Sequence, residues 1–228
     1  MKNTALVRVD AQEAFTPEGG LPVAAGREIV EGVNRVTREA QQRSMLIIDT
    51  VDFHPERHIS FASYWDKPAF SQNPLNPTNP SDLLWTDHGV GGTRDVELID
   101  GIIDPEECVK IYKGWMRNRD AYSAFDMGVT KLRGNAHDGY EVDVGAKTLL
   151  EVLHEARIKT LRLVGLVTEV CIRANTLDAL ENGFDVELVE EGIRGLSPEG
   201  HKTTLEYLAS LDGQPNRQGR VQSVRIMK

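Results

Sequence analysis

The sequence lacks the features of a disulfide-stabilised, exported or membrane-spanning protein. Only two of its 228 residues are cysteines, Cys108 and Cys171, which is too few for a disulfide framework, so we expect free thiols in a reducing compartment. No apolar run approaches the roughly 20 residues that span a bilayer. Residues 1–4 lead directly into an alternating segment without the apolar core of a signal peptide. We therefore predict a cytoplasmic protein that does not act at a membrane.

An excess of positive charge is also missing. The net charge is −9 and no run of Lys and Arg interrupts it, which argues against a nucleic-acid partner. The hydrophobic fraction of 40% and the charged fraction of 27% are those of an ordinary globular protein, and no internal repeat is visible. We predict one domain over residues 1–228, which is compatible with a homo-oligomer.

Segments with the periodicity of strands alternate with segments with the periodicity of helices. The expected strands are 5–9, 45–51, 108–112, 160–167, 184–188 and 221–226, and the expected helices are 29–40, 144–156, 172–182 and 198–211. Gly183 is typical of a helix end, and Ser197-Pro198 of a helix start. This alternation predicts an α/β fold of Rossmann type, with three α/β/α layers and a mostly parallel sheet of about six strands.

Two long segments interrupt the alternation, at about 53–105 and about 114–143. The first is rich in proline and aromatic residues. Loops of this length are uncommon in compact domains and tend to be functional. Both begin where a predicted strand ends, which is the edge of a parallel sheet where ligands bind.

Polar residues follow the ends of four predicted strands. They are Asp10, Asp52, Lys113 and, one short turn after its strand, Cys171. A thiol at a strand-to-helix junction lies near a helix N-terminus, which favours the reactive thiolate. Asp10 is the available base and Lys113 the available cation, and burial and Lys113 would shift the pKa of Asp10 in opposite directions. Taken alone, each residue is better explained as a solvated strand end or, for Cys171, as a buried structural thiol, and only the combination points to a reactive site.

Histidines gather in the first insertion. In an extended segment Asp52 and His54 point the same way and can hold one ion, with His88 completing the site. Oxygen and nitrogen ligands together suit Zn²⁺, Mn²⁺ or Fe²⁺. The other three histidines outside this insertion, His137, His154 and His201, fit structural positions, and we assign no function to the polar loop 212–219.

These residues form motifs that resemble those of the nicotinamidase/pyrazinamidase family, in the isochorismatase-like cysteine hydrolase superfamily. The matching segments are Val9-Asp10-Ala11-Gln12…Phe15, Asp52-Phe53-His54-Pro55…His58-Ile59-Ser60-Phe61-Ala62, Trp85-Thr86-Asp87-His88…Gly92-Thr93, Lys113-Gly114…Tyr122-Ser123-Ala124-Phe125 and Gly165-Leu166-Val167-Thr168-Glu169-Val170-Cys171. They occur in the family's order between about residues 5 and 211, which is far more specific than any single motif.

The resemblance implies hydrolysis of nicotinamide, as part of NAD salvage, with Asp10, Lys113 and Cys171 as catalytic residues and a cysteine thioester as intermediate. It implies an oxyanion hole from the backbone N–H groups of Val167 and Cys171, with a cis peptide bond before Val167. It further implies a divalent metal, Zn²⁺ before Mn²⁺ or Fe²⁺, that binds the pyridine nitrogen. The implied metal ligands are Asp52, His54 and His88, with His58 either a fourth ligand or a contact to metal-bound water, and the implied pocket aromatics are Phe15, Trp85 and Tyr122.

The sequence departs from the family pattern without losing a chemical residue. Val167 and Val170 replace the usual alanine and tyrosine, which leaves the range of amide substrates open, and Gly89 stands where cysteine is common. Three alternatives remain: another amidohydrolase or isochorismatase-type hydrolase of the superfamily, a metal-water hydrolase with a structural Cys171, and a non-catalytic binding protein. Another hydrolase of the superfamily would not require Asp52, His54 and His88. A binding protein would not require Asp10, Lys113 and Cys171.

Overall fold

A six-stranded parallel sheet lies at the centre of the computed structural model, which describes residues 3–78 and 82–228. The strands are β1 (Thr4–Val9), β2 (Leu46–Asp52), β3 (Val109–Lys113), β6 (Thr160–Leu166), β7 (Asp185–Arg194) and β8 (Val224–Met227). Their order is β3-β2-β1-β6-β7-β8, and every neighbouring pair is parallel. The predicted parallel sheet is confirmed.

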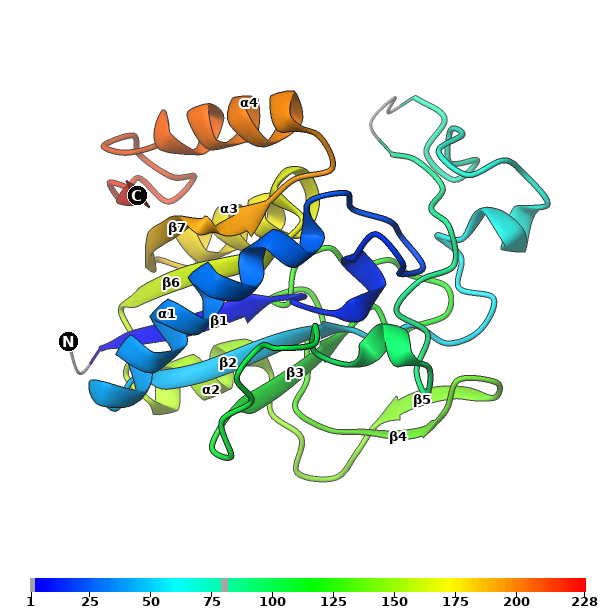
Figure 1. Cartoon of the computed structure of the whole chain (residues 1–228), viewed down its shortest axis with the longest axis horizontal. Helices are drawn as coiled ribbons and strands as arrows, with labels where there is room; N and C mark the ends of the chain where they lie inside the picture. Colours follow the sequence, from blue (N-terminus) through cyan, green and yellow to red (C-terminus); the bar gives the residue numbers. More distant parts are fainter. Residues whose placement is uncertain (1–2, 79–81) are drawn as a thin grey trace.

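Helices cover both faces of this sheet (Figure 1). On one face, α1 (Ile29–Gln42) packs its apolar side against alternate residues of β1 such as Leu6. On the other face, Val7 and its alternates pack in a core with α2 (Leu149–Glu155), α3 (Arg173–Glu181) and α4 (Pro198–Ala209). The two cores follow from the period-2 alternation of a strand buried on both sides. The three-layer α/β/α prediction is confirmed.

Several element boundaries differ from the prediction. The helix expected from residue 144 begins only at Leu149, because Thr148 caps it in a reciprocal capping box with Glu151. The helix expected from residue 172 begins as a π-helical turn over Thr168–Ile172. Strand β7 extends to Arg194, with a register shift against β6, whereas β8 begins at Val224 rather than at residue 221. Local periodicity did not indicate these limits because capping and strand pairing set them.

The second insertion contains an antiparallel hairpin that the sequence pattern did not predict. Its strands are β4 (Leu132–Asn135) and β5 (Gly139–Val142). Both are short, and most of their residues are exposed, so the apolar alternation that identifies a strand is missing.

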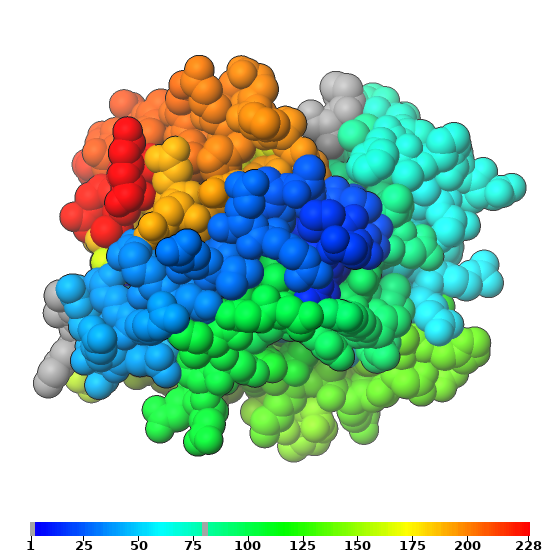
Figure 2. Space-filling model, in the orientation of Figure 1, coloured from blue at the N-terminus to red at the C-terminus, as the bar shows by residue number. Residues whose placement is uncertain are grey.

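The early part of the first insertion, coloured cyan, projects at one end of the molecule, and its later, green part runs across the pictured face below the segment that follows β1 (Figure 2). Its residues 79–81 lie outside the described residues, as do residues 1–2 of the predicted N-terminal segment. None of the helices in the described part of the chain is both long and apolar enough to span a membrane.

The strand order brings the polar residues to one edge of the sheet. The chain runs outward in opposite directions from the central pair β1 and β6, which creates a switch point between their carboxyl ends. Asp10 follows β1, and the turn that carries Cys171 follows β6. On the other side of β1, the strands β2 and β3 end at Asp52 and Lys113. After β1, β2 and β3 the chain enters long segments that begin without an α-helix. After β6, in contrast, the π-helical turn leads directly into α3.

Candidate active site and metal centre

Asp10, Lys113 and Cys171 meet in a buried cluster beneath the switch point. The Lys113 Nζ atom lies 3.1 Å from Asp10 Oδ2 and 3.7 Å from Cys171 Sγ. It also donates a hydrogen bond to the carbonyl oxygen of Ala121, at 3.3 Å. Asp10 and Lys113 are fully buried, and Cys171 is 4% exposed. The structure therefore brings a thiol, a carboxylate and an ammonium group into direct reach of one another.

The turn after β6 determines where the thiol points. Strand β6 ends at Leu166, the peptide bond from Leu166 to Val167 is cis as expected, and the π-helical turn follows at once. Val167 accepts backbone hydrogen bonds from the N–H groups of Val170 and Ile172, both at 3.1 Å. The Glu169 carboxylate accepts hydrogen bonds from the backbone of residues 196 and 197 and so ties this turn to the start of α4.

Burial controls the protonation of the cluster. It raises the pKa of Cys171 well above the ordinary thiol value, and Lys113 only partly opposes it. Burial therefore opposes the stabilised thiolate that the strand-to-helix junction predicts. Burial also raises the pKa of Asp10 against the opposing effect of Lys113, which answers the question that the sequence left open. Burial alone would lower the pKa of Lys113, but Asp10 and Asp52 raise it well above its ordinary value.

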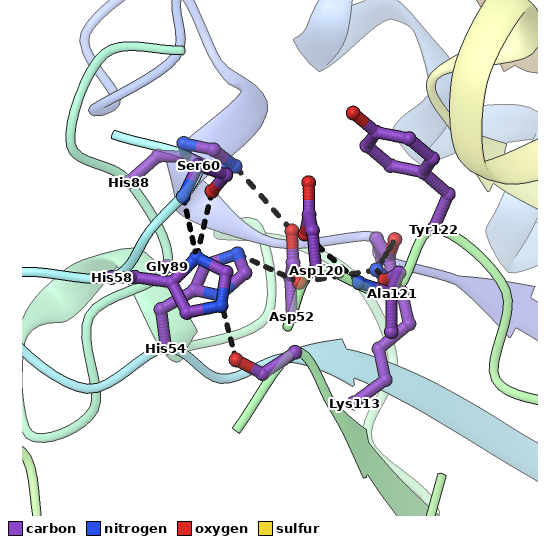
Figure 3. A network of polar contacts seen from close by, with 12 residues as sticks. Asp52, His54, His58, Ser60, His88, Gly89, Lys113, Asp120, Ala121 and Tyr122 are labelled. Carbon is purple, nitrogen blue, oxygen red and sulfur yellow. Dashed lines mark hydrogen bonds and ion pairs between the residues drawn. The ribbon is translucent and has the colours of Figure 1, made fainter. Parts of the chain in front are cut away.

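Asp52, His54 and His88 form a second cluster that adjoins the first (Figure 3). Asp52 Oδ1 lies 3.1 Å from His54 Nε2 and also 3.1 Å from Lys113 Nζ, and Asp52 Oδ2 lies 3.4 Å from His88 Nε2. All three side chains are nearly fully buried. Lys113 thus contacts one carboxylate from each cluster.

The donor atoms of this second cluster are arranged as metal ligands. His54 Nδ1 donates to the carbonyl of Gly114 at 2.8 Å, and His88 Nδ1 donates to the carbonyl of Thr86 at 2.7 Å, so both rings turn Nε2 toward Asp52. Asp52 Oδ1 is buried and faces His54 Nε2 and Lys113 Nζ, each at 3.1 Å. One carboxylate oxygen and two imidazole nitrogens within 4.8 Å of one another fit a divalent transition metal.

Electrostatics agree with that fit. Burial alone would raise the pKa of Asp52, but His54 and Lys113 outweigh it and hold this pKa well below the ordinary carboxyl range. Burial would lower the pKa of His54, but Asp52 raises it, so a metal ion at Nε2 competes with a proton. An ionised carboxylate next to two imidazoles offers a cation one anionic oxygen ligand and two nitrogen ligands.

Backbone contacts of the first insertion and the following loop bring the three ligands together. His54 donates its N–H to Gly89 and accepts from the N–H of Gly91, at 2.8 Å and 2.9 Å, so the loop that carries His88 runs alongside. Gly114 has a φ of +66°, and a Cβ there would lie 2.5 Å from the His54 ring and 2.9 Å from Asp52 Oδ1. A glycine after Lys113 is therefore required by the side chains of the metal cluster.

Two further residues border the metal cluster. His58 lies beside His54, with ring centroids 4.2 Å apart, but its Nδ1 contacts Ser60 Oγ at 2.7 Å and its Nε2 donates to the Arg119 carbonyl at 3.1 Å. Burial lowers the pKa of His58 to about 4, so this ring is neutral. Asp120 forms a second candidate ligand group with His54 and His58. Sequence reasoning missed Asp120 because it lies in an irregular loop, where no periodicity marks it.

A small cavity opens between the two clusters and is lined by Cys171, Asp52, His54 and His88 together with apolar side chains. The predicted aromatics Phe15, Trp85 and Tyr122 all line it, as do Val167 and Val170. Trp85 Nε1 donates to the Tyr122 hydroxyl at 3.2 Å, which joins two of these aromatics. The sequence did not indicate Leu21 and Leu196, which complete the wall from separate loops.

Comparison of the sequence with known proteins finds one family and close relatives. The model of the isochorismatase domain matches residues 4–221. A nicotinamidase of Acinetobacter baylyi is 33% identical over 199 residues, which are 87% of this chain and 84% of the relative. A nicotinamidase of Saccharomyces cerevisiae is 30% identical over 206 residues, which are 85% of this chain and 89% of the relative.

Solved structures show the same fold. The pyrazinamidase of Pyrococcus horikoshii, in complex with zinc, has a TM-score of 0.74 and 30% identity and covers 99% of both chains. A yeast nicotinamidase bound to the inhibitor nicotinaldehyde has a TM-score of 0.71 and 25% identity and also covers 99% of both chains.

Proposed function

The chain belongs to the isochorismatase family, and from that membership and the geometry of its site we propose that it is a nicotinamidase. The enzyme hydrolyses nicotinamide to nicotinate and ammonia, a reaction of NAD salvage. The proposal assigns catalysis to Asp10, Lys113 and Cys171, the oxyanion hole to the backbone of Val167 and Cys171, and substrate contacts to Phe15, Trp85 and Tyr122.

The observation that carries this proposal is the position of Lys113. Its Nζ atom lies 3.1 Å from Asp10 Oδ2, 3.1 Å from Asp52 Oδ1 and 3.7 Å from Cys171 Sγ. One ammonium group therefore connects the nucleophile and its base to a candidate metal ligand. A structural thiol would need neither the buried carboxylate nor the buried cation, since each is costly to bury.

The protonation states define the first step. Because the Cys171 thiol stays protonated, it must transfer its proton to Asp10 as Sγ attacks the carboxamide carbon of nicotinamide. The raised pKa of Asp10 makes it a stronger base than an exposed carboxylate. Lys113 remains charged and stabilises the negative charge that this transfer moves from Asp10 to the Cys171 sulfur. The backbone N–H groups of Val167 and Cys171 stabilise the carboxamide oxygen as it becomes an oxyanion.

The remaining steps reuse the same groups. The C–N bond breaks, Asp10 returns its proton to the leaving nitrogen, and ammonia departs from a Cys171 thioester. Asp10 then accepts a proton from the attacking water, the C–S bond breaks, and Asp10 returns that proton to the Cys171 sulfur. The acid product leaves and loses its remaining proton to solvent as nicotinate. No further base is required, because one carboxylate moves the proton in both halves of the reaction.

Asp52, His54 and His88 would hold a divalent metal, and we propose Zn²⁺ because the similar pyrazinamidase contains zinc. A metal held there would supply a Lewis acid for the pyridine nitrogen, and the three residues would in this way orient the substrate. His58 would lie beside this metal rather than hold it, because its two ring nitrogens contact Ser60 and the Arg119 carbonyl, and Asp120 would add a further carboxylate near the site. The apolar wall then excludes bulk water from the reacting carbon.

The direct test is Cys171→Ala, with ammonia and nicotinate measured from nicotinamide. We expect turnover to fall by at least about 10³-fold, because the nucleophile is lost. Cys108→Ala is the matched control: this half-buried thiol contacts Arg8 on the far side of the sheet and should leave turnover intact. Trapping with hydroxylamine should yield the hydroxamate of nicotinate from the wild-type enzyme and from Cys108→Ala, but not from Cys171→Ala.

Substantial turnover by Cys171→Ala would contradict the covalent route and favour metal-activated water. Unchanged turnover after complete removal of the metal would instead favour another amidohydrolase of the family. If the enzyme releases ammonia from other amides but not from nicotinamide, the proposed reaction type would stand and the proposed substrate would be wrong.

A further inference from the structure

Thr50 on β2 is bonded to Asp10, the residue that follows the neighbouring strand β1. The Thr50 hydroxyl donates to Asp10 Oδ1 at 2.5 Å and accepts from the Asp10 N–H at 3.1 Å. The same N–H also lies 3.2 Å from the Thr50 carbonyl oxygen. The hydroxyl has a single proton, and it donates this proton to Oδ1 of Asp10. This hydrogen bond restricts rotation of the carboxylate. The other oxygen, Oδ2, is then the one that faces Lys113.

Asp10 needs such a restraint because its backbone is unusual. Its φ is +45°, in the left-handed region that residues other than glycine rarely adopt. Thr50 is buried, with 1% exposure, so its hydroxyl is shielded from bulk solvent. The side chain therefore holds both the backbone and the carboxylate of the proposed base.

Gln12 forms the reverse contact, from the segment after β1 to the last residue of β2. Its Oε1 accepts from the Asp52 N–H at 2.7 Å, and its Nε2 donates to the Asp52 carbonyl at 3.0 Å. Nε2 also donates to the Asp95 carbonyl at 3.2 Å. One buried amide thus satisfies both backbone groups of Asp52 and links them to the loop after His88.

We propose that Thr50 and Gln12 are positioning residues, Thr50 for the carboxylate of Asp10 and Gln12 for the carboxylate of Asp52. Thr50 on β2 thus holds the residue that follows β1, and Gln12, in the segment after β1, holds the residue that ends the adjacent strand β2 (Figure 1). Lys113 Nζ lies 3.1 Å from both carboxylates, so it keeps its place between them only while both are held. The inference rests on the proposed function for the roles of Asp10 and Asp52.

The Thr50 half is tested by Thr50→Val, which removes the hydroxyl and keeps the shape, against Thr50→Ser, which keeps the hydroxyl. We expect kcat to fall at least about tenfold in Thr50→Val with KM little changed, and to recover largely in Thr50→Ser. The rate at which iodoacetamide alkylates Cys171, followed by peptide mapping, should fall and recover in the same way. Zn²⁺ affinity should stay at the wild-type value in both variants.

Thr37→Val is the matched control for the Thr50 variants. Thr37 is a fully buried threonine on α1, and its hydroxyl has no hydrogen-bond partner in the described part of the chain. It should leave kcat and the alkylation rate unchanged. Equal loss in Thr50→Val and Thr50→Ser, or no loss in either, would overturn the role of the hydroxyl.

The Gln12 half is tested by the Zn²⁺ affinity of the metal-stripped protein, measured by competition with a chromophoric chelator. Gln12→Met should weaken Zn²⁺ binding by about 10–100-fold, because it removes hydrogen bonds that hold a metal ligand in place. The alkylation rate of Cys171 should change far less. If Gln12→Met does not fold, Gln12→Glu replaces it as the test. Glutamate loses the Nε2 donor and keeps the oxygen acceptor, and it should also weaken Zn²⁺ binding.

Asn34→Leu is the control for Gln12. The buried Asn34 amide donates to the Gly101 carbonyl at 2.7 Å and accepts from the Ile103 N–H at 2.8 Å, the same two-ended contact far from the metal residues. Its loss should lower the melting temperature without changing Zn²⁺ affinity. Unchanged Zn²⁺ affinity in the Gln12 variants, or an equal change in Asn34→Leu, would overturn this half.

Failure of the proposed function is distinguishable from failure of this inference. A wild-type protein that releases no ammonia from nicotinamide would refute the function. The alkylation and Zn²⁺ measurements need no substrate and would still report whether Thr50 and Gln12 hold the two carboxylates.

Discussion

At the scale of single residues, Cys171 shows how burial can outweigh a local electrostatic effect. Its place after a strand and before a helix predicts a stabilised thiolate. In the structure the thiol is 4% exposed and lies near the carboxylates of Asp10 and Asp52, so its pKa is raised instead. In the proposed mechanism the reactive thiolate therefore forms during catalysis, by proton transfer to Asp10, rather than before the substrate arrives.

The pH dependence of kcat/KM for nicotinamide should reflect this protonation. Asp10 must be ionised to accept the thiol proton, and its pKa is raised, so the rate should fall as pH falls through a value above the ordinary carboxyl pKa of about 4. Because the pKa of Cys171 is raised too, loss of the thiol proton should cause no decline up to about pH 9.

A steady-state pH series at saturating Zn²⁺ checks this prediction. Metal content must be measured at each pH, because protonation of His54 would release the metal and imitate the acid limb. An acid limb at or below the ordinary carboxyl pKa, with metal retained, would contradict the raised pKa of Asp10. The apparent values belong to the coupled pair rather than to either residue.

At the scale of elements, the sequence pattern located the strands and helices of the main sheet but not their ends. The apolar periodicity of α1 and of β6 is strong, and both elements occur where predicted. The start of α2 depends on the reciprocal hydrogen bonds of Thr148 and Glu151, and the hairpin β4-β5 depends on pairing rather than burial. Boundaries set by such contacts do not appear in periodicity.

Thr148→Ala should therefore destabilise the protein by about 1 kcal/mol, because the first turn of α2 loses the side chain that accepts from Glu151 N–H. Urea unfolding monitored by circular dichroism measures the difference. Thr203→Ala is the control, since Thr203 lies inside α4 and its hydroxyl bonds back to the Glu199 carbonyl. Alanine there should be neutral or slightly stabilising. Equal effects at both positions would contradict the capping role.

At the scale of the whole molecule, the parallel sheet explains why distant residues share one site. Every strand ends at the same edge, and the order reverses between β1 and β6. Residues that are far apart in the sequence therefore converge at this edge, from the ends of β1, β2 and β3 and from the turn after β6. The motifs allowed the family and the fold to be predicted, and both are confirmed, whereas the single-domain organisation and the roles of the site residues stay predictions.

Zn²⁺ should stabilise the folded chain, because the three ligands converge only in the native state. At a free Zn²⁺ concentration of about 100 times Kd the gain is about 2.7 kcal/mol. Thermal melting of chelator-treated protein with and without Zn²⁺ measures it. His88→Ala should abolish most of the shift, whereas His137→Ala, at an exposed histidine of the second insertion, should retain it. No shift in the wild-type protein would contradict the metal site.

The sequence by itself determined the layers of the fold and the residue types at the strand ends, because apolar periodicity and motif order are local properties of the chain. Tertiary structure alone decided the direction of the pKa shifts at Asp10 and Cys171, the closeness of Asp120 to the metal residues, and the contacts of Thr50 and Gln12. The physical reason is that desolvation and hydrogen bonding depend on which residues pack together. Periodicity can place a residue at an edge, but only packing sets its protonation and its partners.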